Sequence, residues 1–179
     1  FYELLTTLAY IAAQTETVRL GTCTISLPQR DPLILAKQVA TLDVFSNGRF
    51  MLGVGLGAYR DEFEAVKPRE RSANRGKMLQ DSLEALSLLL TQDKVHFESQ
   101  YVEFRGVSLN PKPLQKPFPL YIAGTTSDTL RRIAKWGTGW FLSRTQKEPI
   151  SERISKLLPW LKKYGRDISE IDLVATRGV

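Results

Sequence analysis

The chain has 179 residues, 42% of them hydrophobic, and its 25 basic and 19 acidic side chains give a net charge of +6. A chain of this length can bury one sizeable core, so a single domain is expected. The basic residues occupy several separate stretches without the interleaved aromatic side chains of a nucleic-acid surface, and no apolar run is long enough to span a bilayer, which disfavours both partners.

Helix and strand signals alternate along the chain. They predict a helix over 2–14, a strand over 18–27 that ends at Pro28, a helix from Pro32 to about Phe45, a turn over 46–48 and a strand over 49–55. A helix over roughly 74–91 follows, and then a small hairpin of strands 94–98 and 101–105 joined by Ser99-Gln100. The remaining elements are a strand over 119–123, a helix over 128–136, a strand over 138–143, a helix from Ile150 to Leu161 that Pro159 kinks, and a strand over 171–176.

Strands that alternate with helices indicate a mostly parallel sheet covered by helices. Two architectures fit this pattern, an open doubly wound sheet and a (β/α)8 barrel. A closed barrel needs eight strands and typically about 250 residues. The chain supplies roughly five core strands, begins inside a helix and ends on a strand, so the pattern favours part of a barrel.

The most informative segment is a buried strand that leads into a glycine-rich turn, RFMLGVGLG over residues 49–57. Parallel α/β proteins bind ligands at such strand ends, and glycine lets the backbone approach a flat or anionic ligand. Gly53 to Ala58 can be written G-x-G-x-x-A, but a dinucleotide fingerprint needs a helix that starts within the motif, and a charged segment follows here. An NAD-binding open sheet and a loop whose glycines serve only tight turning are the alternatives.

Cys23 is the single cysteine, which excludes an internal disulfide and is typical of a reducing compartment, so we expect a cytoplasmic protein. No group of Cys, His and acidic residues has metal-ligand spacing, and we expect no metal site. His96, the only histidine, lies in the hairpin and is expected to face solvent rather than to act in catalysis.

Many short runs, in order along nearly the whole chain, then form one joint pattern. They are TVRLGT (17–22), Pro28, PL (32–33), AKQVATLD (36–43), SNGRF (46–50), GVG (53–55), EF (62–63), RG (75–76), PKP (111–113), YIAG (121–124) and GTGW (137–140). This pattern resembles the bacterial luciferase-like monooxygenase family, and within it the branch described as probable F420-dependent oxidoreductases. The resemblance implies a (β/α)8 barrel with inserted segments. Residues 1–179 would then be one barrel domain truncated at both ends, holding about strands 3 to 7 and the small β-hairpin.

The resemblance also implies cofactor contacts. In the family, the strand matching 18–25 carries a bulge, often with a non-prolyl cis peptide, against the isoalloxazine or deazaflavin ring. That bulge falls near Cys23 and Thr24, although Cys23 can equally be read as a small buried apolar residue. In related F420 enzymes, the positions matching Leu56, Gly57 and Asp61 touch the cofactor.

One position departs from the family pattern. Ala58 stands where some members have a proton-donating carboxylate, which weakens a dehydrogenase assignment. The neighbouring Glu62 is expected to be a structural or capping carboxylate. The catalytic residues therefore stay unknown, since the family often takes a catalytic histidine from an early strand that this chain would lack.

The loop after the strand at 119–123 is the best phosphate candidate. It opens a helix, so backbone N–H groups and the positive helix end point at Ala123, Gly124 and Thr125. Ser143, at the end of the next strand, could complete the pocket, together with Arg144. The alternative is an ordinary helix cap in which Ser127 or Asp128 accepts from the first turn; the two can coexist.

These observations predict an oxidoreductase that acts on an unidentified small organic substrate. With reduced FMN the reaction would be oxygenation, with a flavin reductase as a possible partner, and with F420 it would be hydride transfer. The cofactor does the redox chemistry while the protein binds, orients and shields it. The rival hypothesis is a non-catalytic flavin-binding barrel protein, and a homo-oligomer is possible in either case.

Overall fold

Five parallel strand positions follow one another across one curved sheet in the computed structural model, which describes residues 2–142 and 148–175. The first position is split into β1 (Leu20–Gly21) and β2 (Ile25–Ser26), which both pair with β3 (Phe50–Gly55). The order continues through β6 (Leu120–Ala123), β7 (Gly139–Leu142) and β8 (Asp172–Ala175). A doubly wound sheet reverses its strand order at a switch point. This sheet keeps the chain order throughout, so it is part of a barrel.

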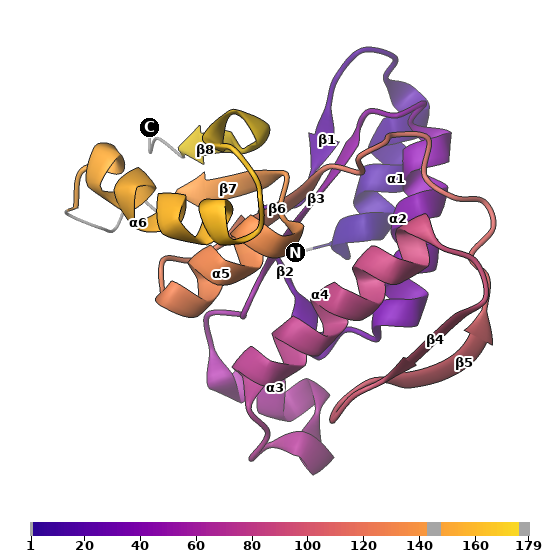
Figure 1. Cartoon of the computed structure of the whole chain (residues 1–179). Coiled ribbons are helices and arrows are strands. Elements are labelled where there is room, and N and C mark those ends of the chain that lie inside the picture. The colour runs from indigo at the N-terminus through magenta and orange to yellow at the C-terminus, as the bar shows by residue number, and fades with distance from the viewer. Residues whose placement is uncertain (1, 143–147, 176–179) are drawn as a thin grey trace.

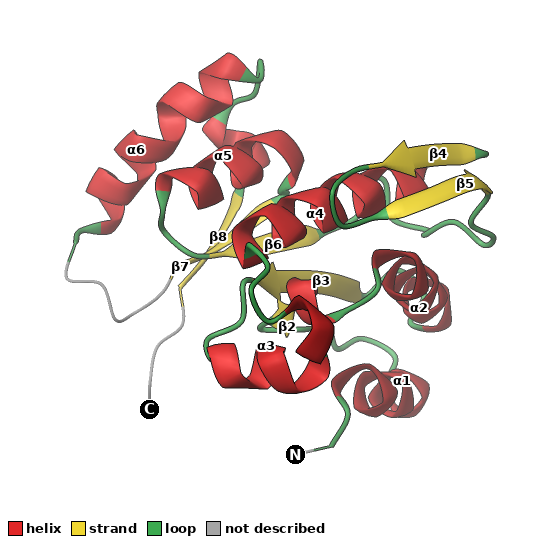
Figure 2. Ribbon diagram, turned by 90° about the horizontal axis from the view of Figure 1, so that it is seen from below, coloured by secondary structure: helices red, strands yellow, loops and turns green. Residues whose placement is uncertain are grey.

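The connecting helices all lie outside the curve of the sheet. Figure 2 shows α1 (Leu4–Gln14), α2 (Pro32–Phe45), α4 (Arg75–Thr91), α5 (Ser127–Trp136) and α6 (Ile150–Lys163) in an arc around the strands. Each helix of this series contacts the next. This is the layering of a (β/α)8 barrel, in which the helices form the outer ring.

Local sequence signals explain where these helices begin. Asp31 caps α2, because its Oδ1 accepts hydrogen bonds from the N–H groups of Leu33 (2.9 Å) and Ile34 (3.0 Å), and Pro32 fills the first helical position. Asn74 caps α4 through a 3.1 Å bond to the N–H of Lys77. The helix α6 runs on through Pro159.

The core lies between the sheet and the helices. Side chains alternate across a strand, and the residues that point outward are large and apolar. On β3 and β6 these are Phe50, Leu52, Val54 and Ile122, each with no exposed surface. Together with Leu83, Leu86 and Leu89 of α4 they belong to one hydrophobic cluster.

The first strand differs from the expectation of one element over 18–27. Between β1 and β2 the chain leaves the regular ladder, and the peptide between Cys23 and Thr24 is cis, as the family resemblance implied. The side chain of Thr22 links this irregular segment to β3. Its Oγ1 donates to the carbonyl of Gly53 and accepts from the N–H of Gly53, both at 2.8 Å.

Short elements were not foreseen. The helix α3 (Arg60–Val66) has one buried side chain, Phe63, so it carries no apolar periodicity. The 3-10 turns η1 (Leu27–Gln29), η2 (Pro68–Glu70) and η3 (Ile168–Glu170) are three residues long.

The predicted hairpin is present as β4 (Val95–Glu98) and β5 (Glu103–Val107), and Figure 1 shows it beside α4, on the outside of the molecule. Its turn is longer than the predicted Ser99-Gln100, since the N–H of Ser99 donates to the carbonyl of Val102 (2.9 Å). The loop therefore runs from Ser99 to Val102, which form its closing hydrogen bond, instead of being limited to Ser99 and Gln100.

A buried carboxylate fixes the return of the chain from the hairpin to β6. Asp43 of α2 has no exposed surface and accepts three hydrogen bonds, from the N–H groups of Leu114 (2.7 Å) and Gln115 (3.2 Å) and from the Gln115 side-chain amide (2.6 Å). Several donors compensate the burial of its charge. The β6 strand is thereby delivered to its place beside β3.

Candidate active site at the carboxyl end of the strands

The loops that follow the parallel strands gather at one end of the sheet. Leu56–Tyr59 follow β3, and Gly124–Thr126 follow β6, its neighbour in the sheet. The Cys23–Thr24 segment precedes β2, which pairs with β3 at Gly55. Barrel enzymes place their active sites at this end. We call it the mouth.

The inner face of the sheet carries two rows of side chains below the mouth. Register pairing aligns the lower row across four strands, and it consists of Gly53, Tyr121, Gly139 and Asp172. The upper row, nearer the mouth, consists of Ala123, Phe141 and Val174. Ala123 is the small residue of this row, and Gly55 of β3 lies beside it, since a Cβ on Gly55 would lie 3.8 Å from the Ala123 Cβ and 3.0 Å from Thr24 Oγ1.

The glycines of the 53–57 segment are required by contacts within the chain. A Cβ on Gly53 would lie 2.0 Å from the carbonyl oxygen of Thr22, and one on Gly55 would lie 3.0 Å from Thr24 Oγ1. Gly57 has a φ of +86°, and its Cβ would lie 2.4 Å from Ser26 Oγ. The glycines therefore bring the segment from Thr22 to Ser26 close against β3, a role that differs both from the expected approach to a ligand and from tight turning alone.

The residues of that segment are accessible at the mouth. Cys23 and Thr24 are both exposed, so the reading of Cys23 as a small buried residue is wrong. Leu56, a large apolar side chain of the turn after β3, is 39% exposed. The structure places the segment with Cys23 and Thr24 beside the turn with Leu56 and Gly57, because Ser26 pairs with Gly55 and lies against Gly57.

The acidic positions lie further out. Asp61 and Glu62 are exposed and occupy the first turn of α3, where carboxylates are favoured by the helix dipole. Ala58, beside them in the turn, is also exposed. Arg75 holds the turn, because its Nη1 donates to the carbonyls of Tyr59 (3.2 Å) and Gly57 (3.4 Å). No sequence pattern predicts this role.

The loop after β6 opens α5, and its cap differs from the expectation. Thr126 is the N-cap, with its Oγ1 accepting from the N–H of Thr129 (3.2 Å), so the cap lies one residue before Ser127. Gly124 has a φ of +125°, which favours glycine. The indole Nε1 of Trp140 donates to the Gly124 carbonyl (2.8 Å), which fixes the loop against β7.

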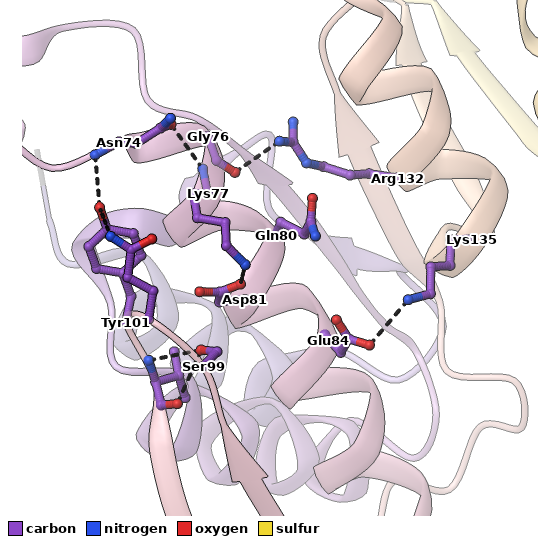
Figure 3. Close-up of polar contacts among 12 residues, drawn as sticks. Asn74, Gly76, Lys77, Gln80, Asp81, Glu84, Ser99, Tyr101, Arg132 and Lys135 are labelled. Atoms are coloured by element: carbon purple, nitrogen blue, oxygen red, sulfur yellow. Dashed lines mark hydrogen bonds and ion pairs between the residues drawn. The ribbon is translucent and has the colours of Figure 1, made fainter.

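Polar contacts also fix the start of α4 at the mouth, as Figure 3 shows. The buried Arg132 of α5 donates from Nη2 to the carbonyl of Gly76 (2.9 Å), and burial lowers the pKa of Arg132. From the other side, the N–H of Asn74 donates to the Tyr101 hydroxyl at the tip of the hairpin (3.1 Å). The helix that carries Arg75 is therefore held on both flanks.

The remaining candidates lie away from the mouth or outside the description. Ser143 and Arg144 fall outside the described residues. His96 is exposed on β4, as expected, in the hairpin. Within residues 2–142 and 148–175, no group of three His, Cys, Asp or Glu side chains could hold a metal ion, and no helix is long and apolar enough to cross a bilayer.

Two open grooves flank α2 on the outer surface, of about 430 and 270 Å³. Both contain the stems of Lys37 and Gln38, with apolar neighbours such as Leu33 and Leu42. None of their lining residues belongs to the loops at the carboxyl ends of the strands, so the grooves are separate from the mouth.

Comparison with known proteins agrees with this geometry. The sequence model of the family described as luciferase-like monooxygenase matches residues 2–179. An uncharacterized protein of Mycobacterium tuberculosis is 34% identical over 160 residues, which are 87% of this chain and 55% of that protein. The FMNH2-dependent dimethylsulfone monooxygenase of Pseudomonas putida is 33% identical over 113 residues, 63% of this chain and 31% of that enzyme.

Solved structures show the same fold. A monooxygenase from Streptomyces bottropensis matches with a TM-score of 0.82 and 27% identity, over 97% of this chain and 53% of that one. The coenzyme F420-dependent tetrahydromethanopterin reductase of Methanopyrus kandleri matches with a TM-score of 0.82 and 22% identity, over 97% and 54%. The chain spans about half the length of the first curated relatives it matches.

Proposed function

The chain belongs to the luciferase-like monooxygenase family, and from that premise we propose that the whole protein is an oxidoreductase that binds reduced FMN or F420 at the mouth and acts on a small organic substrate. The observation that carries the proposal is the set of accessible or small residues at the mouth. It consists of the exposed Cys23–Thr24 peptide, the upper-row Ala123 and the exposed Leu56. A flat ring needs such a surface of backbone and small side chains.

The ends of two helices suit the anionic tail of either cofactor. The first N–H groups of α5 lie beside Gly124 and Thr125, and a helix N-terminus favours a phosphate. Arg75, at the start of α4, supplies a guanidinium next to the 57–59 turn. We propose that Ala123, Gly124 and Thr125 bind this tail, that Cys23, Thr24, Leu56 and Gly57 contact the ring side, and that Asp61 lies at the outer rim.

Reduced FMN is the first candidate. The dimethylsulfone monooxygenase, at 33% identity, is described as FMNH2-dependent, and Ala58 offers no acid beside the turn. When bound, reduced FMN supplies electrons to dioxygen for the oxygenation of a substrate, and the protein orients the ring and excludes water. A separate flavin reductase is then the proposed partner. F420 is the second candidate, favoured by the sequence pattern of that branch.

Titration of the whole protein with each cofactor tests the assignment. We expect the fluorescence of FMN to be quenched when it binds. Ala123→Phe, which places a bulky ring on the inner face beside Gly55, should weaken binding more than tenfold. Ala13→Phe, on the exposed face of α1, is the matched control and should bind like the wild type. Failure of both FMN and F420 to bind the wild type would rule the proposal out.

Turnover separates the enzyme from a non-catalytic flavin-binding barrel. The whole protein is supplied with FMN, a flavin reductase, NADH and oxygen, and a panel of small sulfones, ketones and amines is screened for oxygenated products. Substrate-dependent product formation supports the enzyme. Tight FMN binding without turnover on any member supports the binding protein instead.

A further inference from the structure

Two aromatic rings cross on the inner face, directly below the mouth. Tyr121 of β6 leans over β7, where a Cβ on Gly139 would lie 2.2 Å from its ring. Phe141 of β7 leans the other way, over β6 to β3, where a Cβ on Gly53 would lie 2.4 Å from its ring. The ring centroids are 5.3 Å apart and the planes are tilted by 34°. Each glycine makes room for the ring of a neighbouring strand.

The crossed rings cover the inner face from one side to the other. On the β3 side, the Phe141 ring lies at Gly53, whose N–H and carbonyl are bound by Thr22. On the β8 side, the Tyr121 hydroxyl donates to Asp172 Oδ2 at 2.6 Å. Tyr121 is 3% exposed and Phe141 is 9% exposed, so both are close-packed. We call this pair the aromatic floor.

The floor and the residues nearer the mouth differ in the size of their side chains. Phe141 shares the upper row with Ala123, but its ring reaches down to the level of Gly53, so the large rings occupy the lower level while Gly55 and Ala123 add little volume nearer the mouth. The tyrosine cannot swing away easily, because its ring is packed against Gly139 and its hydroxyl is anchored on Asp172. It therefore supports the phenylalanine from behind.

We propose that Phe141, supported by Tyr121, sets the depth of the mouth and is the residue that limits the length of an apolar substrate. This inference rests on the proposed function, since it assumes that the substrate enters beside a cofactor ring bound at Thr24, Leu56 and Ala123. A phenylalanine ring at this level of the inner face rejects longer chains by overlap. Removal of the ring extends the apolar space by the length of two or three methylene groups, with about fourfold in affinity for each methylene newly buried.

The test uses the whole protein loaded with FMN and a series of straight-chain 2-ketones from butanone to decanone. Binding of each ketone is followed by the change in flavin absorbance, which gives a profile of affinity against chain length. In the wild type we expect affinity to rise and then fall at a limiting length. Phe141→Ala should move that limit by two or three carbons, and Phe141→Leu, which leaves a smaller space and is easier to fold, by about one.

Leu142→Ala is the matched control. Leu142 is the next residue of β7, it is 3% exposed, and it faces the helices as part of the hydrophobic cluster. This variant loses stability but should keep the wild-type chain-length limit. An unchanged limit in both Phe141 variants, or no ketone binding by any protein that has bound FMN, overturns the inference. Failure of the wild type to bind FMN or F420 is a different result, which removes the proposed function and this inference together.

Discussion

The two faces of the sheet differ in what their side chains do. The outer face presents large aliphatic and aromatic residues such as Phe50, Leu52 and Ile122, all without exposed surface, and the helices cover them. The inner face alternates glycine with tyrosine, and alanine with phenylalanine. The outer face can lose volume only at the expense of stability. On the inner face, the glycine positions make room for neighbouring groups. There an added methyl group would overlap with those groups and displace them.

The largest expected effect is on the outer face. Leu52→Ala removes a fully buried side chain from the cluster, and we expect the free energy of unfolding to fall by about 2–5 kcal/mol. Urea unfolding of the whole protein measures it. FMN affinity, measured below the unfolding transition, should stay within about twofold of the wild type. A large loss of FMN affinity in folded Leu52→Ala would show that the two faces are not separable.

For Gly53, the residue next to Leu52, we expect a smaller loss of stability and a larger loss of FMN affinity. Gly53→Ala adds a methyl group that meets the Thr22 carbonyl and the Phe141 ring, so we expect a loss of about 1–3 kcal/mol in unfolding free energy. The Thr22–Thr24 segment must move to accommodate it. FMN affinity should therefore fall at least tenfold although stability falls less than in Leu52→Ala. Equal FMN affinity in wild type and Gly53→Ala would contradict the role given to this segment.

Two glycines with positive φ allow the cost of backbone conformation to be measured separately from the cost of a steric contact. Gly57 and Gly165 have φ values of +86° and +66°, but only Gly57 has a neighbour, Ser26 Oγ, in the place of a Cβ. Alanine at a left-handed position costs about 1–2 kcal/mol. Gly165→Ala should show that loss alone. Gly57→Ala should show at least as much in urea unfolding, and also a weakened FMN titration, because the turn lies at the mouth.

The smallest effect concerns the polar end of the aromatic floor. Tyr121→Phe removes the bond to Asp172, and we expect a loss of about 1 kcal/mol at neutral pH. Burial, with the hydrogen bond and charge of Asp172, raises the pKa of Tyr121. A folded pKa above the unfolded value of about 10 means that this contribution is complete below pH 10 and is lost as pH rises further.

Unfolding measured from pH 8 to 11 should therefore show a steeper decline for the wild type than for Tyr121→Phe. Tyr10→Phe, a change at an exposed tyrosine of α1, should follow the wild-type curve. Parallel curves for wild type and Tyr121→Phe would show that the phenol does not titrate in this range.

The sequence predicts the outer face well and the inner face poorly, for a physical reason. Helix and strand periodicity report burial against the helices, so the elements around Leu52 and Leu86 were placed correctly. The cis peptide at Cys23–Thr24 and the cofactor contacts proposed for Leu56, Gly57 and Asp61 came from the family resemblance. The loop over 123–125 came from its place between a strand and a helix.

Other features depend on register between strands far apart in sequence. The pairing of Gly53 with the ring of Phe141 links residues 88 positions apart, and no local pattern encodes it. The cap lies at Thr126 instead of at Ser127 or Asp128, because all three are good capping residues and the sequence does not rank them. Arg75 had no predicted role, since only the folded chain brings its guanidinium to the turn at Tyr59.

Because Trp140 donates a hydrogen bond to the Gly124 carbonyl, its intrinsic fluorescence should report on the loop that contains Gly124. Trp140 is 1% exposed, whereas Trp136 and Trp160 are partly exposed, so its emission should lie furthest to the blue. Its indole ends at the loop proposed to hold the cofactor tail. Rearrangement of that loop would change the emission of this tryptophan, and stopped-flow fluorescence could time the arrival of a ligand without any label.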